Sequence, residues 1–232
     1  VVQSCGMEGS SGKVTTPYAK EKLSTAGSAG SNVSTEVGDD SDEEDLDEET
    51  ARVYRSNAMR VNFAATERPE LQCVCRELAK GMKDPKVRHW QMLKRVARFL
   101  KKRPRVVQRI SPSGHLKTLQ VWVDSNHAGC IRTRKSTMGG VIQLGKGTIK
   151  TYSKGQAVIA LSSGEAEYYG LVSGISNGLG EQSLLADWDI AVNLQIWMDA
   201  TAGIAIGKRR GLGRVKHVDV AFLWVQEIVN RG

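Results

Sequence analysis

The sequence predicts an α/β fold, in which a sheet with flanking helices follows a small helical segment and a disordered N-terminal region. Two strand-like runs, 119–124 and 194–199, share Leu, Gln, Trp and a terminal Asp at the same phase. Between them lies a helix-like stretch with three glycines spaced four residues apart. The first 50 residues are instead rich in Gly, Ser and acidic side chains, which do not build a core.

Length and composition set the first limits on the class of protein. With 232 residues, 40% of them hydrophobic, the chain suffices for one sizeable core, or for one core plus a smaller helical unit. A charged fraction of 25% argues against a wholly disordered chain or a fibre. No run approaches the ~18 apolar residues of a membrane-spanning helix, and no signal-peptide pattern opens the sequence. We therefore expect an intracellular protein, cytoplasmic or nuclear and not secreted, without a membrane partner.

The cysteines and the first residue add two further expectations. Four cysteines, two of them in a Cys-Val-Cys spacing at 73–75, match neither a disulfide framework nor a CxxC metal or redox pair. A reducing compartment is therefore expected. The chain begins at Val1 without an initiator Met, which predicts a piece of a longer protein.

Charge divides the chain into two parts. Residues 1–50 hold three basic and twelve acidic residues, whereas residues 51–232 hold 30 basic and 13 acidic residues, a net charge of +17. We interpret 1–50 as a disordered acidic linker, because like charges repel and keep the chain extended. The alternative is an acidic arm that competes with nucleic acid for the basic remainder. A folded part this basic predicts a polyanionic partner, with nucleic acid as the first candidate.

Residues 51–110 predict a helical segment. Apolar residues recur at helical spacing within 54–65 and again within 71–82. A third helix is the best defined, because Asp84 can cap its start and Pro104 ends it.

Residues 116–232 predict the sheet domain, which opens with the strand at 119–124. The next two strand-like runs, 140–144 and 148–152, predict a hairpin that turns at the Gly-Lys-Gly of 145–147. This hairpin would supply the antiparallel part of the sheet.

A long helix is predicted after the hairpin. The apolar run 157–161 reads as extended, and Ser162 to Glu165 then matches the S-x-x-E capping box that opens a helix. The three glycines of this helix begin at Gly170, and each costs ~1 kcal/mol relative to Ala. Three at one spacing predict close backbone packing against a neighbouring element.

The rest of the chain comprises the strand at 194–199, a basic loop and an amphipathic helix over about 218–229. Trp122 and Trp197 alternate with positions expected to be buried. We therefore expect both tryptophans in the core rather than as platforms for base stacking.

The two strands that end in aspartate predict a functional site. Taken singly, Asp124 and Asp199 could be ordinary strand-end residues. If the two strands are parallel neighbours, their carboxyl ends lie in one crevice, where open α/β sheets bind ligands. Clustered carboxylates need a counter-ion or they raise one another's pKa, and Mg²⁺ is the natural choice because it prefers oxygen ligands.

A third carboxylate is expected from the glycine-striped helix, where Glu165 and Glu167 compete for the role. Glu165 is better explained by the capping box, whereas Glu167 lies one turn before Gly170 and would project toward the sheet. An acidic metal site in a basic body favours phosphodiester hydrolysis with metal-activated water.

Five motifs occur in chain order: WVDSNHAG (122–129), KST (135–137), ALSSGEAEY (160–168), IWMDA (196–200) and VKHVD (215–219). Together they resemble the ribonuclease H domain of copia-type retrotransposon polyproteins. The EAEY block and its order relative to the two Asp strands are the specific features.

The upstream segment resembles the end of the reverse transcriptase in the same family. Its matching motifs are YRS (54–56), TERPEL (66–71), HW (89–90) and KRVARFL (94–100). The resemblance thus covers about residues 51–232. It implies a polyprotein that also contains reverse transcriptase and integrase as partners.

The resemblance implies a ribonuclease H-like fold that cleaves the RNA strand of RNA–DNA hybrids as an endonuclease with Mg²⁺, or alternatively with Mn²⁺. By motif, Asp124 is the first-strand acid, Glu167 the helix acid and Asp199 the fourth-strand acid. The family's fourth carboxylate lies past a further strand, which is expected beyond Gly232, so the domain is expected to be C-terminally truncated. Asp219 is not its equivalent by motif.

Basic residues near these motifs are the residues expected to bind nucleic-acid phosphates. They are Arg132, Arg134, Lys135, Lys208, Arg209, Arg210, Arg214 and Lys216. The alternative function is a catalytically inactive nucleic-acid-binding remnant of such a polyprotein, and a purely structural domain is a further rival.

Overall fold

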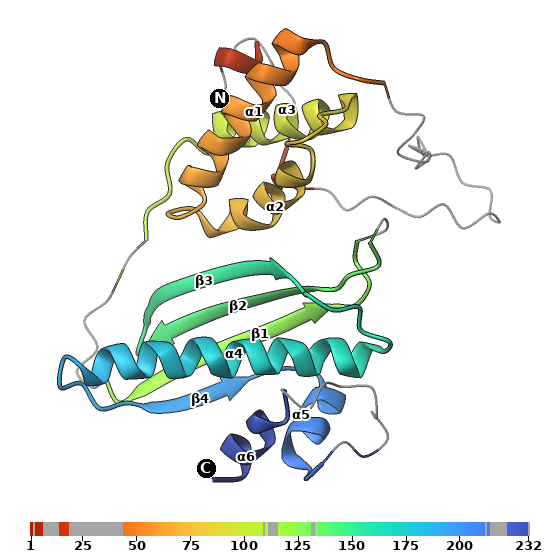
Figure 1. The fold of residues 1–232 in the computed structure, drawn as a ribbon. Coiled ribbons are helices and arrows are strands. Elements are labelled where there is room, and N and C mark those ends of the chain that lie inside the picture. The colour runs from red at the N-terminus through yellow and green to blue at the C-terminus, as the bar shows by residue number, and fades with distance from the viewer. Residues whose placement is uncertain are drawn as a thin grey trace. The chain divides into compact units, whose positions relative to one another are not determined.

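The structure is a computed structural model. It describes residues 1, 3–6, 14–18, 44–108, 110, 116–130, 133–211, 213 and 222–231. The chain divides into two compact units, Val1–Val107 and Gln108–Gly232, which we name the helical unit and the sheet unit (Figure 1). The predicted class is confirmed, because a mixed sheet with flanking helices follows a helical segment.

The helical unit contains the three predicted helices. They are α1 (Glu48–Ala64), α2 (Gln72–Lys80) and α3 (Val87–Lys102). Two short 3-10 turns accompany them, η1 (Gln3–Cys5) and η2 (Pro69–Leu71). The apolar stripes that predict these helices face inward and form one core.

Side chains from all three helices are fully buried in that core, among them Tyr54, Val61, Leu78 and Leu93. The Tyr54 hydroxyl donates a 2.5 Å hydrogen bond to the Leu78 carbonyl, which satisfies a polar group that would otherwise be buried without a partner. This bond ties α1 to the last turns of α2.

The start of α3 differs from the prediction that Asp84 caps it. The N-cap residue is Lys86, whose backbone N–H donates to Nδ1 of His89 at 2.9 Å. Val87 donates its N–H to the Glu44 carbonyl at 3.1 Å, so residues just before α3 pair with an incoming extended segment. This pairing holds Lys86 extended and delays the helix, while Asp84 forms a 3.0 Å ion pair with Lys86.

The N-terminal 50 residues also differ in part from the predicted linker. Cys5 and Val14 are buried against the helical core, and Ser4 Oγ donates a 2.8 Å bond to Oδ1 of Asn57. Asp47 caps α1 by accepting the Thr50 N–H at 2.9 Å. Isolated apolar side chains in a polar segment can therefore anchor on an existing core. Residues 19–43, which hold part of the acidic run, lie outside the described residues.

The sheet unit contains a four-stranded mixed sheet. Its strands are β1 (Thr118–Asn126), β2 (Thr137–Leu144), β3 (Gly147–Gly155) and β4 (Asn193–Trp197), in the order β3-β2-β1-β4. The predicted hairpin is β2–β3, and β2 also pairs with β1 in the antiparallel direction. β1 and β4 are parallel neighbours.

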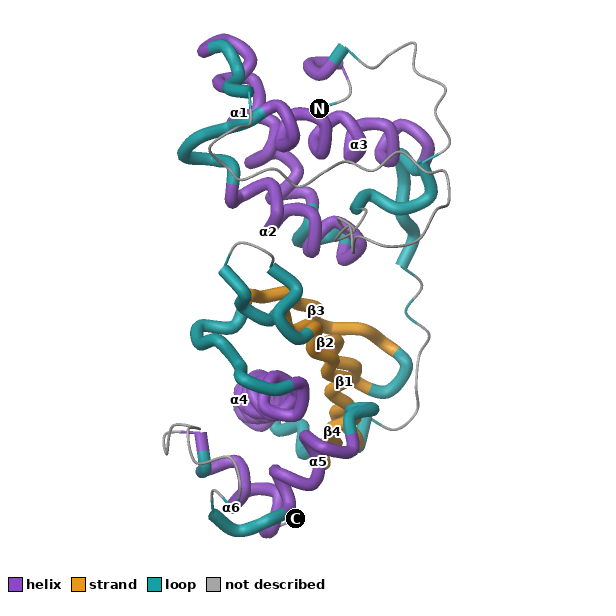
Figure 2. The backbone as a smooth tube through the Cα atoms, turned by 90° about the vertical axis from the view of Figure 1, so that its right-hand side faces the viewer, coloured by secondary structure: helices purple, strands orange, loops and turns teal. Residues whose placement is uncertain are grey.

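One long helix, α4 (Ser163–Ala186), lies along the sheet, and Figure 2 shows it nearly end-on beside the strands. An added Cβ at Gly178 would lie 2.7 Å from Leu194 Cδ1 and 3.0 Å from Val121 Cγ2. A Cβ at Gly174 would collide with Val123. The close packing predicted from the glycine spacing is therefore present at Gly174 and Gly178.

Two further helices complete the sheet unit, α5 (Thr201–Lys208) and α6 (Trp224–Arg231). Ile206 of α5 and Val225 of α6 are buried in one core cluster with residues of α4. The amphipathic helix expected over about 218–229 therefore corresponds to α6, and residues 214–221 lie outside the described residues.

Both tryptophan predictions are wrong. Trp122 and Trp197 are each 44% exposed and stack on one another, with ring centroids 5.3 Å apart. Strand alternation explains the error, because Val121 and Val123 point toward α4 and direct Trp122 to the opposite face.

The extended run predicted over 157–161 lies in the loop between the end of β3 at Gly155 and the start of α4. Within this run Ala160 is buried, whereas Leu161 is exposed. Separately, no helix within the described ranges is long and apolar enough to span a membrane.

The glycine packing gives the first prediction. Replacing Gly174 by Ala should lower the melting temperature of the protein, because overpacking a core costs ~1–3 kcal/mol and exceeds the ~1 kcal/mol gained in helix propensity. Gly180→Ala on the same helix is the matched control, since an added Cβ there meets nothing within 4 Å. That control should raise the melting temperature, and equal shifts of the two variants would contradict the packing argument.

Candidate functional site

The sheet register places two of the predicted acids side by side. In the parallel β1–β4 pair, Trp122 lies opposite Trp197, so Asp124 and Asp199 each follow two residues later at the same end. Both aspartates are exposed. The site therefore forms where the carboxyl ends of parallel strands meet.

The first turns of α4 supply the third acid. Glu167 is only 8% exposed. One carboxylate oxygen each from Asp124, Glu167 and Asp199 can be chosen such that all three lie within 4.8 Å of one another. The structure thus brings together the three acids singled out in the sequence.

Glu165, the competing residue, is engaged in holding the start of α4. Its backbone N–H donates to Ser162 Oγ at 3.2 Å, and its carboxylate accepts the Leu161 N–H at 2.8 Å. The other carboxylate oxygen accepts a 2.8 Å hydrogen bond from the Tyr169 hydroxyl. The Ser162 half of the predicted capping box is present, while the Glu165 carboxylate accepts the N–H of Leu161, one residue before the cap. These bonds engage Glu165 and leave Glu167 as the helix acid that faces the aspartates.

The cluster is electrostatically strained. Burial, and then the charges of Asp124 and Asp199, raise the pKa of Glu167 from 4.5 to about 7. The Ser125 N–H donates a 2.8 Å bond to Oδ1 of Asp124 and offsets part of the charge on that carboxylate. Near neutral pH, Glu167 is therefore poised between its protonated and ionised forms.

The donor set fits a divalent cation. Three carboxylates converging within 4.8 Å offer the hard oxygen ligands that Mg²⁺ and Mn²⁺ accept. A cation would also remove the repulsion that raises the pKa of Glu167. The arrangement could thus hold a metal ion beside a partly open surface, since both aspartates are exposed.

Sequence reasoning missed one residue that supports this site, Gln156. It follows β3 and is only 3% exposed. Its side chain bonds to Ser125 and to the Ala166 carbonyl, which are the chain neighbours of Asp124 and Glu167. No periodicity or motif in a single sequence marks such a residue, because its partners are far apart along the chain.

The basic residues predicted to bind nucleic acid fall in two segments. Arg134 is exposed and has a positive φ of 54°, and Lys135 is half-buried beside it. At the end of α5, Lys208 and Arg210 are exposed and Arg209 is half-buried. The other three predicted residues, Arg132, Arg214 and Lys216, lie outside the described residues.

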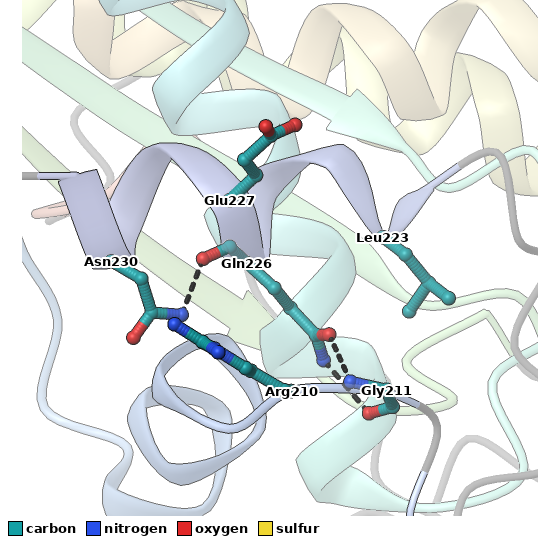
Figure 3. A pocket seen from close by; sticks show the side chains of 6 residues that line it. All are labelled: Arg210, Gly211, Leu223, Gln226, Glu227 and Asn230. Carbon is teal, nitrogen blue, oxygen red and sulfur yellow. Dashed lines mark hydrogen bonds between the residues drawn. The ribbon is translucent and has the colours of Figure 1, made fainter.

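A hollow beside the second segment is lined by Arg210, Gly211 and residues of α6 (Figure 3). Oε1 of Gln226 accepts the Gly211 N–H at 2.9 Å, and Nε2 donates to the Gly211 carbonyl at 3.1 Å. Gln226 therefore fixes the chain just after Arg210. The residues that line this hollow do not include Asp124, Glu167 or Asp199.

Comparison with known proteins gives several relatives. The chain is 36% identical over 104 residues to the secreted RxLR effector protein 161 of Plasmopara viticola. The matched residues are 45% of this chain and 72% of that protein. It is 26% identical over 165 residues to the retrovirus-related Pol polyprotein from transposon TNT 1-94 of Nicotiana tabacum, over 70% of this chain. It is 33% identical over 115 residues, half of this chain, to the corresponding polyprotein from transposon RE2 of Arabidopsis thaliana.

The matched part is a small share of the two polyproteins, 12% of the TNT 1-94 polyprotein and 8% of the RE2 polyprotein. No family model matches the chain. No solved structure matches it either.

The raised pKa of Glu167 gives a prediction about stability. Between pH 4.5 and about 7 the folded chain keeps a proton on Glu167 that the unfolded chain has lost, so wild-type stability falls as pH rises through this window. Glu167→Gln removes the penalty. We expect the metal-free variant to melt above the wild type at about pH 8, with the difference narrowing toward about pH 4.5.

The control is Glu181→Gln on the same helix, which removes a carboxylate paired with Lys150 at 2.8 Å instead of one facing other acids. Thermal unfolding in a chelator across this pH range checks the prediction. A Glu167→Gln variant whose melting temperature tracks the wild type at every pH would contradict it.

Proposed function

We propose that the sheet unit of this chain, which is similar to retrovirus-related Pol polyproteins from transposons, cleaves the RNA strand of RNA–DNA hybrids in a Mg²⁺-dependent, endonucleolytic reaction. The observation that carries the proposal is the convergence of the Asp124, Glu167 and Asp199 carboxylates within 4.8 Å. They meet at the carboxyl ends of two parallel strands, where α/β sheets bind ligands.

The three acids would hold the cation, and Mn²⁺ could replace Mg²⁺ because both accept oxygen ligands. When bound, such ions activate the attacking water and stabilise the leaving oxygen of a phosphodiester. Exposure of Asp124 and Asp199 leaves the site open to a long polymeric substrate. The Ser125 N–H holds Oδ1 of Asp124 in place.

Charge supports a nucleic-acid substrate. Residues 51–232 carry a net charge of +17, and two basic segments adjoin the acids along the chain. Arg134 and Lys135 lie in the connection that follows β1, which carries Asp124. Lys208 to Arg210 end α5, which begins directly after Asp199 and Ala200. Cationic side chains in these two segments would hold the phosphates of a hybrid.

The same charge favours a second function, binding of nucleic acid without cleavage. Phosphate binding needs only the basic side chains, whereas cleavage needs all three carboxylates in place. The two functions predict different responses when one acid is removed.

A cleavage assay on an RNA–DNA hybrid with Mg²⁺ separates them. We expect Asp124→Asn to lower the cleavage rate at least ~100-fold, because a lost ligand should cost more than the ~10–100-fold typical of a supporting residue. Asp187→Asn, an exposed aspartate at the end of α4, is the matched control and should cleave like the wild type. Full activity of Asp124→Asn would refute the proposed site. A wild-type protein that binds the hybrid but does not cleave it would favour the binding function.

The salt dependence of hybrid binding tests the basic segments. Replacing both Lys208 and Arg210 by Ala should weaken binding and reduce the slope of log affinity against log salt by ~0.9 for each phosphate that the variant no longer neutralises. Lys150→Ala is the control, because Lys150 is paired with Glu181 on the α4 side of the sheet. An unchanged slope in the double variant would exclude this segment from the interface.

A further inference from the structure

Gln156 lies at the junction of the elements that carry the acids. It follows the last residue of β3 and, at 3% exposed, is buried almost completely. Buried polar side chains are retained in folded proteins when their hydrogen bonds are satisfied, so the partners of Gln156 indicate what it holds.

The side-chain amide binds the neighbours of two acids at once. Nε2 of Gln156 donates to the Ala166 carbonyl at 2.7 Å and to Ser125 Oγ at 3.2 Å. Ala166 directly precedes Glu167 on α4. Ser125 directly follows Asp124 on β1, and its N–H donates to Oδ1 of that aspartate at 2.8 Å. One amide group therefore connects the segments from which Asp124 and Glu167 project.

The backbone of Gln156 fixes a third segment. Its N–H donates to the Ser136 carbonyl at 2.8 Å, one residue before β2 begins. Ser136 is 1% exposed, and its Oγ accepts the N–H of Ala128, a residue with a positive φ of 49°. The connection between β1 and β2 is thus anchored at the same point as the start of α4.

We propose that Gln156 is a positioning residue that sets the spacing between the Asp124 and Glu167 carboxylates, acting through Ser125 and Ala166. This inference rests on the proposed function, because the spacing matters only for holding a cation between the acids. It assigns to β3 and its following residue a part in a site that otherwise belongs to β1, β4 and α4.

The chemistry of the amide explains why this position holds Gln. A carbonyl such as that of Ala166 accepts hydrogen bonds only, so the group facing it must be a donor. Nε2 carries two N–H groups and serves both partners, whereas a carboxylate would repel the Ala166 carbonyl. Oε1 of Gln156 is buried and accepts no bond from the described residues. An apolar side chain would avoid that unsatisfied acceptor but would release both Ser125 and Ala166.

The test compares Gln156→Met with Gln226→Met. Met has a similar length and no donor, so the first variant should break both side-chain bonds. Gln226 is a matched control, because it is 5% exposed and its amide also ties backbone groups together, at Ile206 and Gly211. Both variants should lose thermal stability, but only Gln156→Met should disturb the acids.

The first readout is Mg²⁺ and Mn²⁺ affinity of the full chain by calorimetry, under conditions where each variant is folded. We expect Gln156→Met to bind ~10–100-fold more weakly than the wild type, as is typical when a residue that orients metal ligands is lost. Gln226→Met should bind like the wild type. Wild-type affinity in folded Gln156→Met would overturn the proposal. If Gln156→Met does not fold, Gln156→Glu keeps the size, loses both N–H donors when ionised, and should also weaken binding.

The second readout is amide hydrogen exchange in the metal-free protein. Gln156→Met should speed exchange selectively at residues 124–126 and 163–170, relative to Gln226→Met. A uniform increase, as expected from packing alone, would overturn the proposal. Hydrogen exchange tests the role of Gln156 separately from the proposed function. If the wild type binds no cation, the proposed metal site is wrong, but the exchange rates still show whether Gln156 positions the segments that carry Asp124 and Glu167.

Discussion

The parallel pairing of β1 with β4 is the constraint on which the site depends. Their register sets Trp122 opposite Trp197 and so carries Asp124 and Asp199 to the same end of the sheet. Helix α4 can deliver Glu167 to that end because Gly174 and Gly178 let its backbone approach Val121, Val123 and Leu194. A larger residue at either glycine would push α4 outward and take Glu167 with it. Packing of apolar groups thus fixes the position of a charged cluster.

In the metal-free protein, repulsion among the three carboxylates lowers the stability of the sheet unit. Burial, and then the charges of Asp124 and Asp199, raise the pKa of Glu167 to about 7, so the metal-free sheet unit holds a group whose ionisation destabilises it. The surrounding hydrogen bonds resist this repulsion by fixing the segments that carry the acids. Glu165 secures the first turn of α4 through Leu161 and Tyr169. Gln156 connects that turn to the end of β1. Two neighbouring glutamates on one helix therefore have different roles, one in the fold and one in the site.

Much of the candidate site could be predicted because its signals are local. The two LQ-W-D runs, the S-x-x-E capping box and the glycine spacing each depend on residues close together in sequence, and strand or helix phase then directs the side chains. The wrong prediction for the start of α3 depended on a distant partner. Asp84 does not cap α3, because residues 44–46 pair with the segment just before that helix. Cys5 and Val14 pack on a core built from helices later in the chain.

The sequence by itself therefore determined the class of fold and the relation to copia-type polyproteins, and it singled out the three acids that the structure brings together. These inferences depend on alternation, capping and motif order, which can be followed along the chain. Only the tertiary structure decided which strands are neighbours, how closely the carboxylates converge, and that Trp122 and Trp197 stack in an exposed position. It also revealed Gln156, whose partners lie ten residues or more away in sequence. The physical reason is that periodicity reports which way a side chain points, whereas its neighbours are set by how separate elements pack.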